Sequence, residues 1–168
     1  MKILLVGKDG MIGKSLSSYL KRYNLISCGK KEFNLENNNN ILNIIDKYKT
    51  NIFINAAAYT NVNLAETEKD KVKKINSDSL TVIAKKLKKL NSLLIHYSSD
   101  YVFDGKKNRF YYEDDLTNPL QYYGVSKKLS EQNISKINCK HIILRTSWVY
   151  SKHGNNFVKK ILNQKNSS

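Results

Sequence analysis

The stretch ILLVGKDGMIG, residues 3–13, carries an apolar run followed at once by three regularly spaced glycines. A continuous apolar run is typical of a parallel strand that is buried on both faces. Glycines between such a strand and a helix permit a tight turn, let backbone amides approach a pyrophosphate, and allow the helix to pack closely on the strand. This stretch therefore predicts the first strand, turn and helix of a dinucleotide-binding fold.

The spacing of Gly7, Gly10 and Gly13 is G-x-x-G-x-x-G, which differs from the G-x-G-x-x-G of many dehydrogenases. Among dinucleotide folds, this wider spacing resembles the short-chain dehydrogenase/reductase superfamily. A glycine turn without a ligand is the structural alternative. The chain has only seven glycines, so three at this junction favour the ligand.

Further apolar segments alternate between strand-like and helix-like patterns along the rest of the chain. Strands are predicted at 25–28, 52–58, 93–98 and 141–145, and helices at 12–20, 41–48, 72–90, 123–136 and 156–163. Strands separated by helices imply a parallel sheet with right-handed crossovers. We expect an α/β fold, a Rossmann-like doubly wound parallel sheet in three α/β/α layers, as one NAD(P)-binding domain over residues 1–168.

The chain is strongly basic, with 29 Lys and Arg against 14 Asp and Glu and a net charge of +15 over 168 residues. Such a charge normally raises the question of nucleic-acid binding. However, only three of these cations are Arg, the residue preferred for bidentate phosphate and base contacts. Lysine pairs at 73–74, 85–86 and 88–89 alternate with apolar positions, as on a solvated helix face. We therefore expect no nucleic-acid partner. An anionic dinucleotide or nucleotide-sugar would be attracted by the same positive electrostatic field.

The sequence contains no run near the roughly 20 apolar residues that a membrane helix needs, and its N-terminus does not resemble a signal peptide. We therefore expect a cytoplasmic protein with no membrane partner. Cys28 and Cys139 have neither CxxC spacing nor a histidine cluster nearby, so we expect no disulfide scaffold and no metal site.

Tyr123 and Lys127 stand four residues apart in YGVSK, which puts a phenol and an ammonium on one helical face. An ammonium beside a phenol lowers the phenol pKa from about 10 and makes it a better proton donor near neutrality. Ser99 ends a predicted strand, where ligand crevices of parallel sheets open, and its hydroxyl suits a substrate carbonyl. A chance Tyr–Lys pair and a capping serine are the structural alternatives.

Five motifs follow one another in the chain, namely NAAAYT at 55–60, HYSSDYVFDG at 96–105, YGVSK at 123–127, RTSWVY at 145–150 and GNNF at 154–157. Together they resemble the dTDP-4-dehydrorhamnose reductase family. The resemblance implies an NAD(P)H-dependent oxidoreductase of dTDP-L-rhamnose, and hence polysaccharide, biosynthesis. Such enzymes pass hydride from NAD(P)H to the C4 ketone of dTDP-4-dehydro-L-rhamnose.

By this resemblance, Tyr123 is the proton donor, Lys127 holds the nicotinamide ribose and tunes Tyr123, and Ser99 polarises the ketone. Asp100 and Trp148 match substrate-contacting positions. The implied cofactor-binding positions are Gly7, Gly10, Met11, Ile12, Gly13, Asn34, Leu35, Ala58, Tyr59, Thr60, Tyr123 and Lys127.

Near the end of the chain, Gly154 and Asn155 are expected in a loop under the sugar nucleotide. The alternative for Trp148 is an aromatic residue of the core. Ser15 stands where some relatives place a glutamate that helps to bind magnesium, so no metal is carried over.

After the second predicted strand the chain has Cys28-Gly29-Lys30-Lys31, where an acidic residue would accept the ribose hydroxyls of NAD. Asn34-Leu35 also lacks the acidic residue that relatives often have there. Without a carboxylate and with added lysines, the sequence favours NADPH over NADH.

The chain matches about the N-terminal half of the family pattern, so we expect most of the substrate-binding lobe to be absent. A homodimer, or a second chain that supplies this lobe, is the expected partner beside a dTDP-sugar. The alternative function is a non-catalytic NADP-binding regulatory subunit resembling that of methionine adenosyltransferase. The Ser99, Tyr123 and Lys127 set favours an enzyme, because a binding module needs no proton donor.

Overall fold

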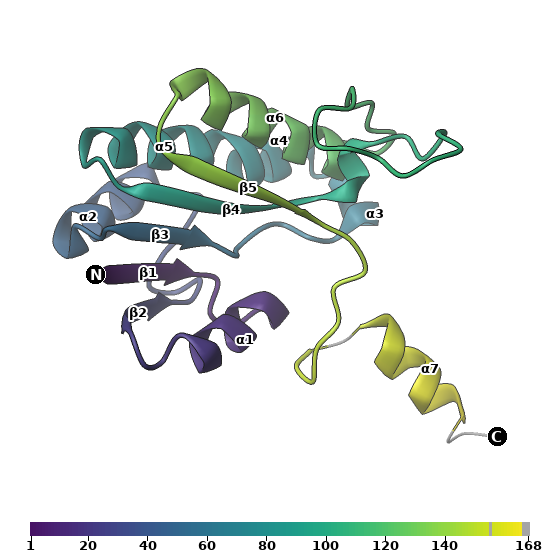
Figure 1. The fold of residues 1–168 in the computed structure, drawn as a ribbon, viewed down its shortest axis with the longest axis horizontal. Helices are drawn as coiled ribbons and strands as arrows, with labels where there is room; N and C mark the ends of the chain where they lie inside the picture. Colours follow the sequence, from purple (N-terminus) through teal and green to yellow (C-terminus); the bar gives the residue numbers. More distant parts are fainter. Residues whose placement is uncertain (155, 166–168) are drawn as a thin grey trace.

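A computed structural model describes residues 1–154 and 156–165, and a five-stranded parallel sheet forms its centre (Figure 1). The strands are β1 (Lys2–Val6), β2 (Asn24–Cys28), β3 (Ile52–Asn55), β4 (Leu93–Ser99) and β5 (His141–Thr146). They lie in the order β2-β1-β3-β4-β5, and every pair is parallel. This order reverses direction between β1 and β3, as in a doubly wound sheet, so the predicted fold class is confirmed.

Helices cover both faces of the sheet. They are α1 (Met11–Tyr19), α2 (Asn38–Tyr48), α3 (Val62–Ala65), α4 (Lys69–Lys73), α5 (Ser79–Lys89), α6 (Tyr122–Ile137) and α7 (Phe157–Lys165), with a π-helical turn η1 (Lys74–Asp78) and a 3₁₀ turn η2 (Asp100–Val102). Helices α2, α5 and α6 lie over one face and α1 over the other, whereas α7 lies away from the sheet (Figure 1). None of the helices described here has the length and apolar character to cross a membrane.

The alternation of side chains along β1 divides the core between the two faces of the sheet. Leu4 and Val6 join the larger cluster under α2, α5 and α6, while Ile3 and Leu5 join the smaller cluster with α1. All four side chains are buried, as the continuous apolar run predicts.

The third strand is shorter than the predicted segment 52–58. It ends at Asn55, and the chain then crosses closely over the glycine turn. A Cβ on Gly7 would lie 2.7 Å from the Ala56 carbonyl carbon and the Ala57 nitrogen, so only glycine fits there. The apolar Ala56–Ala58 segment therefore leaves the sheet and becomes one wall of a cavity.

The helix predicted over 72–90 is one helical segment made of α4, the π-helical turn η1 and α5. Such π-turns occur often at functional sites. Here the turn contains the buried Asn76, whose contacts are described below. Two short elements, α3 and η2, were not predicted from the sequence.

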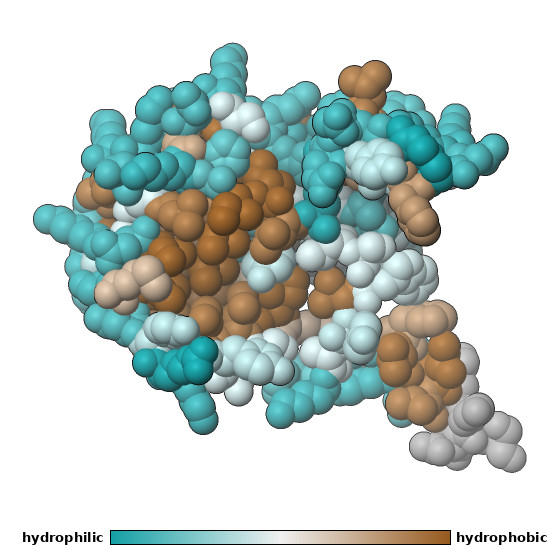
Figure 2. All heavy atoms as spheres, viewed as in Figure 1, coloured by the Kyte–Doolittle hydropathy of each residue, from teal (hydrophilic) through white to brown (hydrophobic). Residues whose placement is uncertain are grey.

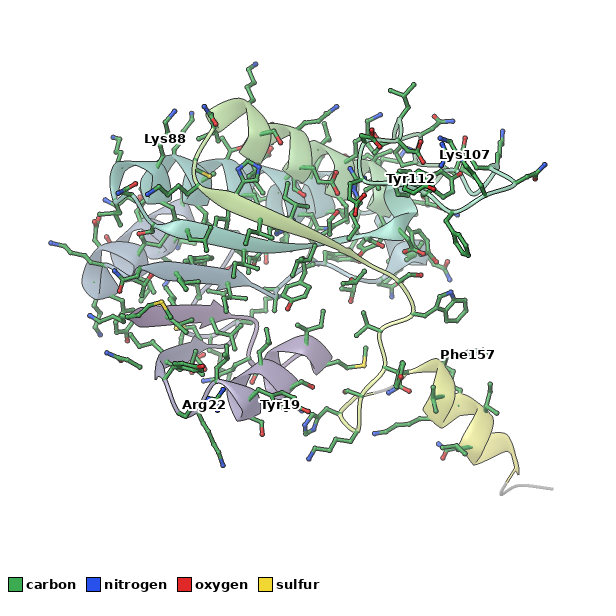
Figure 3. The ribbon with its side chains drawn as sticks, viewed as in Figure 1. Tyr19, Arg22, Lys88, Lys107, Tyr112 and Phe157 are labelled. Atoms are coloured by element: carbon green, nitrogen blue, oxygen red, sulfur yellow. The ribbon has the colours of Figure 1, made fainter. Side chains whose placement is uncertain are left out.

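One strip of the sheet on the α1 side has no helix over it among the described residues. Ile142 and Leu144 on the edge strand β5 are 47% and 38% exposed, and Ile95 and Tyr97 of β4 are partly buried beside them. Figure 2 shows this apolar patch between α1 and the edge of the sheet. Figure 3 shows that charged side chains such as Arg22, Lys88 and Lys107 lie around the periphery.

Candidate functional site

A cavity of about 800 Å³ opens at the carboxyl ends of the strands, next to the point where the strand order reverses. Its size is within the range of pockets that bind small molecules and cofactors. In doubly wound sheets, ligands bind at this position. The predicted site residues that line it are Gly7, Gly10, Met11, Ile12, Asn34, Leu35, Ala58, Tyr59, Thr60, Ser99, Asp100, Tyr123, Lys127 and Trp148.

The glycine turn forms one end of this cavity. Gly7 has a φ of +93°, and its carbonyl accepts a hydrogen bond from the Gly10 amide at 3.1 Å. Helix α1 then begins with no side-chain cap and no acidic residue in its first turn. Its first amides and the positive end of its dipole therefore suit an anionic group.

Gly13 does not line the cavity, although the sequence places it in the cofactor motif. It is buried, and a Cβ there would lie 1.9 Å from the Gly7 carbonyl oxygen. Its role in this structure is to let α1 approach the turn.

Tyr59 belongs to the wall that follows β3, and two groups hold it in place. Asn76 of the π-helical turn accepts from the Tyr59 amide at 2.8 Å and donates to its carbonyl at 3.1 Å. The Tyr59 hydroxyl donates to Glu68 at 2.6 Å, and this hydrogen bond raises the pKa of the phenol. Asn76 also donates to Ser126 of α6 at 3.0 Å, so it ties this wall to the helix of the YGVSK motif. Asn76 was not predicted as a site residue. The available signal was an amide side chain next to Ile75, among the apolar positions of the predicted helix 72–90.

Ser99 ends β4 at the mouth of the cavity. Its hydroxyl donates to Asp100 Oδ1 at 3.0 Å and accepts from the Tyr101 amide at 3.2 Å. The other oxygen of Asp100 accepts from Ser147 at 2.6 Å. Ser99 thus caps η2, the structural alternative, and also lines the cavity.

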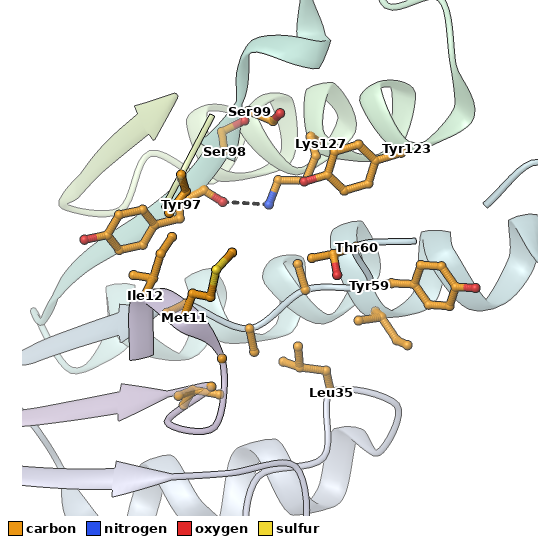
Figure 4. Close-up of a pocket in the computed structure, with 18 of the residues that line it drawn as sticks. Met11, Ile12, Leu35, Tyr59, Thr60, Tyr97, Ser98, Ser99, Tyr123 and Lys127 are labelled. Atoms are coloured by element: carbon orange, nitrogen blue, oxygen red, sulfur yellow. Dashed lines mark hydrogen bonds between the residues drawn. The ribbon is translucent and has the colours of Figure 1, made fainter. Parts of the chain in front are cut away.

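Lys127 is buried in the interior, with 2% of its surface exposed. Its ammonium donates to the Tyr97 carbonyl at 2.6 Å, the contact that Figure 4 shows as a dashed line. Burial lowers the pKa of this amine to about 8, although nearby Glu131 acts in the opposite direction. The Lys127 ammonium is therefore deprotonated at a lower pH than the ammonium of a surface lysine.

Tyr123 also reaches the cavity, from the first turn of α6. Burial raises the pKa of its phenol, and the nearby Ser99 hydroxyl opposes that rise in part. The sequence-based expectation that Lys127 lowers this pKa is wrong for this structure. The reason is that the Lys127 ammonium donates to the Tyr97 carbonyl and the phenol is desolvated.

Trp148 is not a core aromatic, because 73% of its surface is exposed. It adopts a φ of +49° and packs edge-on against Phe157, with ring centroids 5.0 Å apart. Gly154 also lines the cavity, against the side chain of Met11. Asn155, predicted to share this loop, lies outside the described residues.

Two carboxylates converge at the end of β2, where no acidic group was expected from the sequence. Asp9 Oδ2 lies 2.1 Å from the position of a Cβ on Gly29, and Glu32 Oε2 lies 3.1 Å from it. The amide of Gly29 donates to Glu32 at 2.8 Å. These acids were missed because neither directly follows the strand in the sequence. The glycine turn brings Asp9 to the end of β2, and the hydrogen bond from the Gly29 amide brings Glu32 there.

The described residues contain no group of three or more His, Cys, Asp or Glu side chains arranged to hold a metal ion.

A family model described as "RmlD substrate binding domain" matches residues 1–168. The dTDP-4-dehydrorhamnose reductase of Aggregatibacter actinomycetemcomitans is 40% identical over 164 residues, which cover 96% of this chain and 56% of that protein. The enzyme of the same name from Escherichia coli K12 is 38% identical, with 96% and 56% covered. This chain thus spans little more than half the length of these relatives.

Among solved structures, the dTDP-4-dehydrorhamnose reductase of Bacillus anthracis in complex with NADP superposes with a TM-score of 0.95 and 32% identity. The superposition covers 100% of this chain and 61% of that one. The UDP-glucose 4-epimerase of Thermotoga maritima shares the fold, with a TM-score of 0.83, 20% identity, and 98% and 62% covered. These matches do not support the alternative of a regulatory subunit.

Proposed function

Because the chain belongs to the family described as RmlD substrate binding domain, we propose that it is the NAD(P)H-binding and catalytic portion of a dTDP-4-dehydrorhamnose reductase. Its reaction would reduce the C4 ketone of dTDP-4-dehydro-L-rhamnose to the alcohol. One observation carries the proposal: Ser99, Tyr123 and Lys127 line the same cavity as the glycine turn.

The cavity fits a nicotinamide dinucleotide chemically. The uncapped start of α1 suits a pyrophosphate, and the side chains of Met11, Ile12 and Leu35 offer apolar walls to the flat rings. When bound, the reduced nicotinamide supplies the hydride. We propose that Asn34, Ala58, Tyr59 and Thr60, which also line the cavity, contact the cofactor.

The residues of β4 and α6 have separate roles in this proposal. Tyr123 donates its phenol proton to the ketone oxygen as negative charge develops there, and Ser99 polarises that oxygen with its hydroxyl. Lys127 binds the cofactor ribose, because its ammonium has donor capacity beyond the single Tyr97 carbonyl. Asp100 and the exposed Trp148 are proposed to contact the sugar nucleotide.

The proposal also covers partners and location. The chain would act on a dTDP-sugar in the cytoplasm, as one half of a homodimer or with a second polypeptide that completes the substrate site.

The test has two stages. Isothermal titration of this chain with NADH and NADPH measures cofactor binding. Oxidation of the cofactor is then followed with dTDP-4-dehydro-L-rhamnose, for the chain alone and for a fusion to the C-terminal remainder of a full-length relative. The proposal is supported if the fusion oxidises the reduced cofactor and the same fusion carrying Tyr123→Phe does not. A chain that binds neither cofactor, or a cofactor-binding fusion without turnover, contradicts it.

A further inference from the structure

Glu32 is an anion held in a site built from an ammonium and a backbone amide. One carboxylate oxygen accepts from the Lys8 ammonium at 2.7 Å and the other from the Gly29 amide at 2.8 Å. These contacts lower the pKa of Glu32, the lysine first and the amide second. Ammonium groups and backbone amides are the donors with which proteins bind phosphate groups.

This anion site adjoins the cavity proposed for the cofactor. A second hollow is lined by Lys8, Asp9, Lys30, Lys31, Glu32 and Asn34, and three of these residues, Asp9, Lys30 and Asn34, also line the larger cavity. The two spaces therefore meet at the end of β2.

In dinucleotide folds, the residues at this position face the adenosine ribose. A carboxylate about 20 residues beyond the glycines accepts the 2′-hydroxyl of NAD, whereas a cation accommodates the 2′-phosphate of NADP. Glu32 follows Gly13 by about that distance, and its contact with the Gly29 amide brings it back to the strand end.

Gly29 is required for this arrangement. Asp9 fills the space that a side chain at position 29 would occupy, since a Cβ there would lie 2.1 Å from its carboxylate oxygen. In many dinucleotide folds a single acidic residue directly after β2 provides the carboxylate at this place. In this chain the carboxylates of Asp9 and Glu32, from two different segments, lie there instead.

Two of the nearby lysines each have a carboxylate partner. Lys8 pairs with Glu32, and Lys30 lies 3.8 Å from Glu36. The expectation that Lys30 acts without an opposing carboxylate is therefore revised.

We propose, on the basis of the proposed function, that Glu32 sets the preference between NADH and NADPH. Its carboxylate occupies the anion site of Lys8 and Gly29, so a 2′-phosphate has to displace it. A ribose 2′-hydroxyl, in contrast, can donate to Glu32 or Asp9. Glu32 thus lowers the affinity for NADPH without lowering that for NADH.

The test is calorimetric titration of the chain with each cofactor, in the wild type, Glu32→Gln, and Glu32→Gln combined with Lys8→Met. We expect Glu32→Gln to raise NADPH affinity on the order of tenfold and to change NADH affinity by less than about threefold. The added Lys8→Met substitution should remove the gain, because the freed ammonium would bind the phosphate.

Asp46→Asn is the matched control, since Asp46 of α2 pairs with Lys86 of α5 and neither residue lines the cavity or the second hollow. It should leave both affinities unchanged. Equal changes for NADH and NADPH in Glu32→Gln, or no change for NADPH, would overturn the proposal while leaving the proposed function intact. Failure of the wild type to bind either cofactor would overturn both.

Discussion

His96 Nε2 and the Lys127 ammonium lie 3.4 Å apart in the interior, and burial together with the Lys127 charge lowers the pKa of His96, so a neutral imidazole lies beside a buried cation. Ser130 donates to the Lys127 carbonyl at 2.6 Å, which leaves its oxygen to accept from His96 Nε2–H at 3.0 Å. Asn55 then donates to His96 Nδ1 at 3.1 Å. This chain of hydrogen bonds connects the end of β3 to the helix of the proposed catalytic residues.

Lys127→Met should stabilise the fold at pH 7 while abolishing any reductase activity. Burial lowers the pKa of Lys127 from 10.5 to about 8. That shift corresponds to on the order of 3 kcal/mol of unfavourable free energy while the amine is charged. Loss of the bond to the Tyr97 carbonyl offsets part of it, so we expect a net gain of about 1–2 kcal/mol.

The pH dependence follows from the same shift. Below about pH 8 the amine is protonated in both folded and unfolded chains, so the penalty is fully present. Between about pH 8 and 10.5 the unfolded chain binds more protons, and wild-type stability rises relative to the variant. Urea unfolding of both proteins at pH 7 and pH 10 measures this; a variant less stable than the wild type at both pH values contradicts the prediction.

His96→Asn should weaken the acid sensitivity of the fold. Burial, with a smaller contribution from Lys127, holds the pKa of His96 well below 6.5, so it stays neutral when folded. As the pH falls below 6.5 the unfolded chain takes up a proton that the folded chain does not, and stability falls by about 1.4 kcal/mol per pH unit. Urea unfolding from pH 7 to 5 should show a smaller slope in His96→Asn than in the control His141→Asn. Equal slopes would refute the assignment.

Tyr123→Phe should reduce turnover by about 10²–10⁴-fold and leave cofactor affinity nearly unchanged, because the phenol proton is needed only as the alkoxide forms. Ser99→Ala should cost about 10²–10³-fold, since one donor to the developing oxyanion is lost. Single-turnover oxidation of bound cofactor in the fusion separates these effects from binding. Normal turnover by Tyr123→Phe would remove it from the mechanism.

Gly13→Ala should destabilise the chain by several kcal/mol, because the new methyl would overlap the Gly7 carbonyl oxygen. Gly10→Ala is the comparison, since its Cβ would lie at an ordinary 3.5 Å from the same oxygen. Thermal unfolding of both variants checks this; similar melting temperatures would show that the turn can adjust.

Much of the fold could be predicted from the sequence because the parallel strands are short apolar runs bounded by glycine or polar residues. The end of β3 could not, since Ala56–Ala58 are as apolar as the strand and leave it only because they cross Gly7. The π-helical turn η1 likewise gives no signal in the apolar spacing of the helix that contains it.

For the candidate site, the motif residues indicated which side chains line the cavity, apart from the buried Gly13. The groups beneath them were not predicted, because their contacts join residues far apart in the sequence. His96 lies beside Lys127, 31 positions away, and Asn76 donates to Ser126, 50 positions away. The acids at the end of β2 were missed for a related reason. Their approach depends on a turn that brings Asp9 over Gly29.

The open strip beside β5 affects how the stability of this chain varies with temperature. Ile142 and Leu144 are already hydrated in the folded state, so unfolding exposes less new apolar surface than it would in a sheet covered on both sides. The heat-capacity increment of unfolding grows with that surface. At about 0.45 cal/mol/K per Å² of apolar surface, two side chains lower the increment by less than about 1 cal/mol/K per residue, so we expect a value toward the low end of the usual 12–15 cal/mol/K per residue.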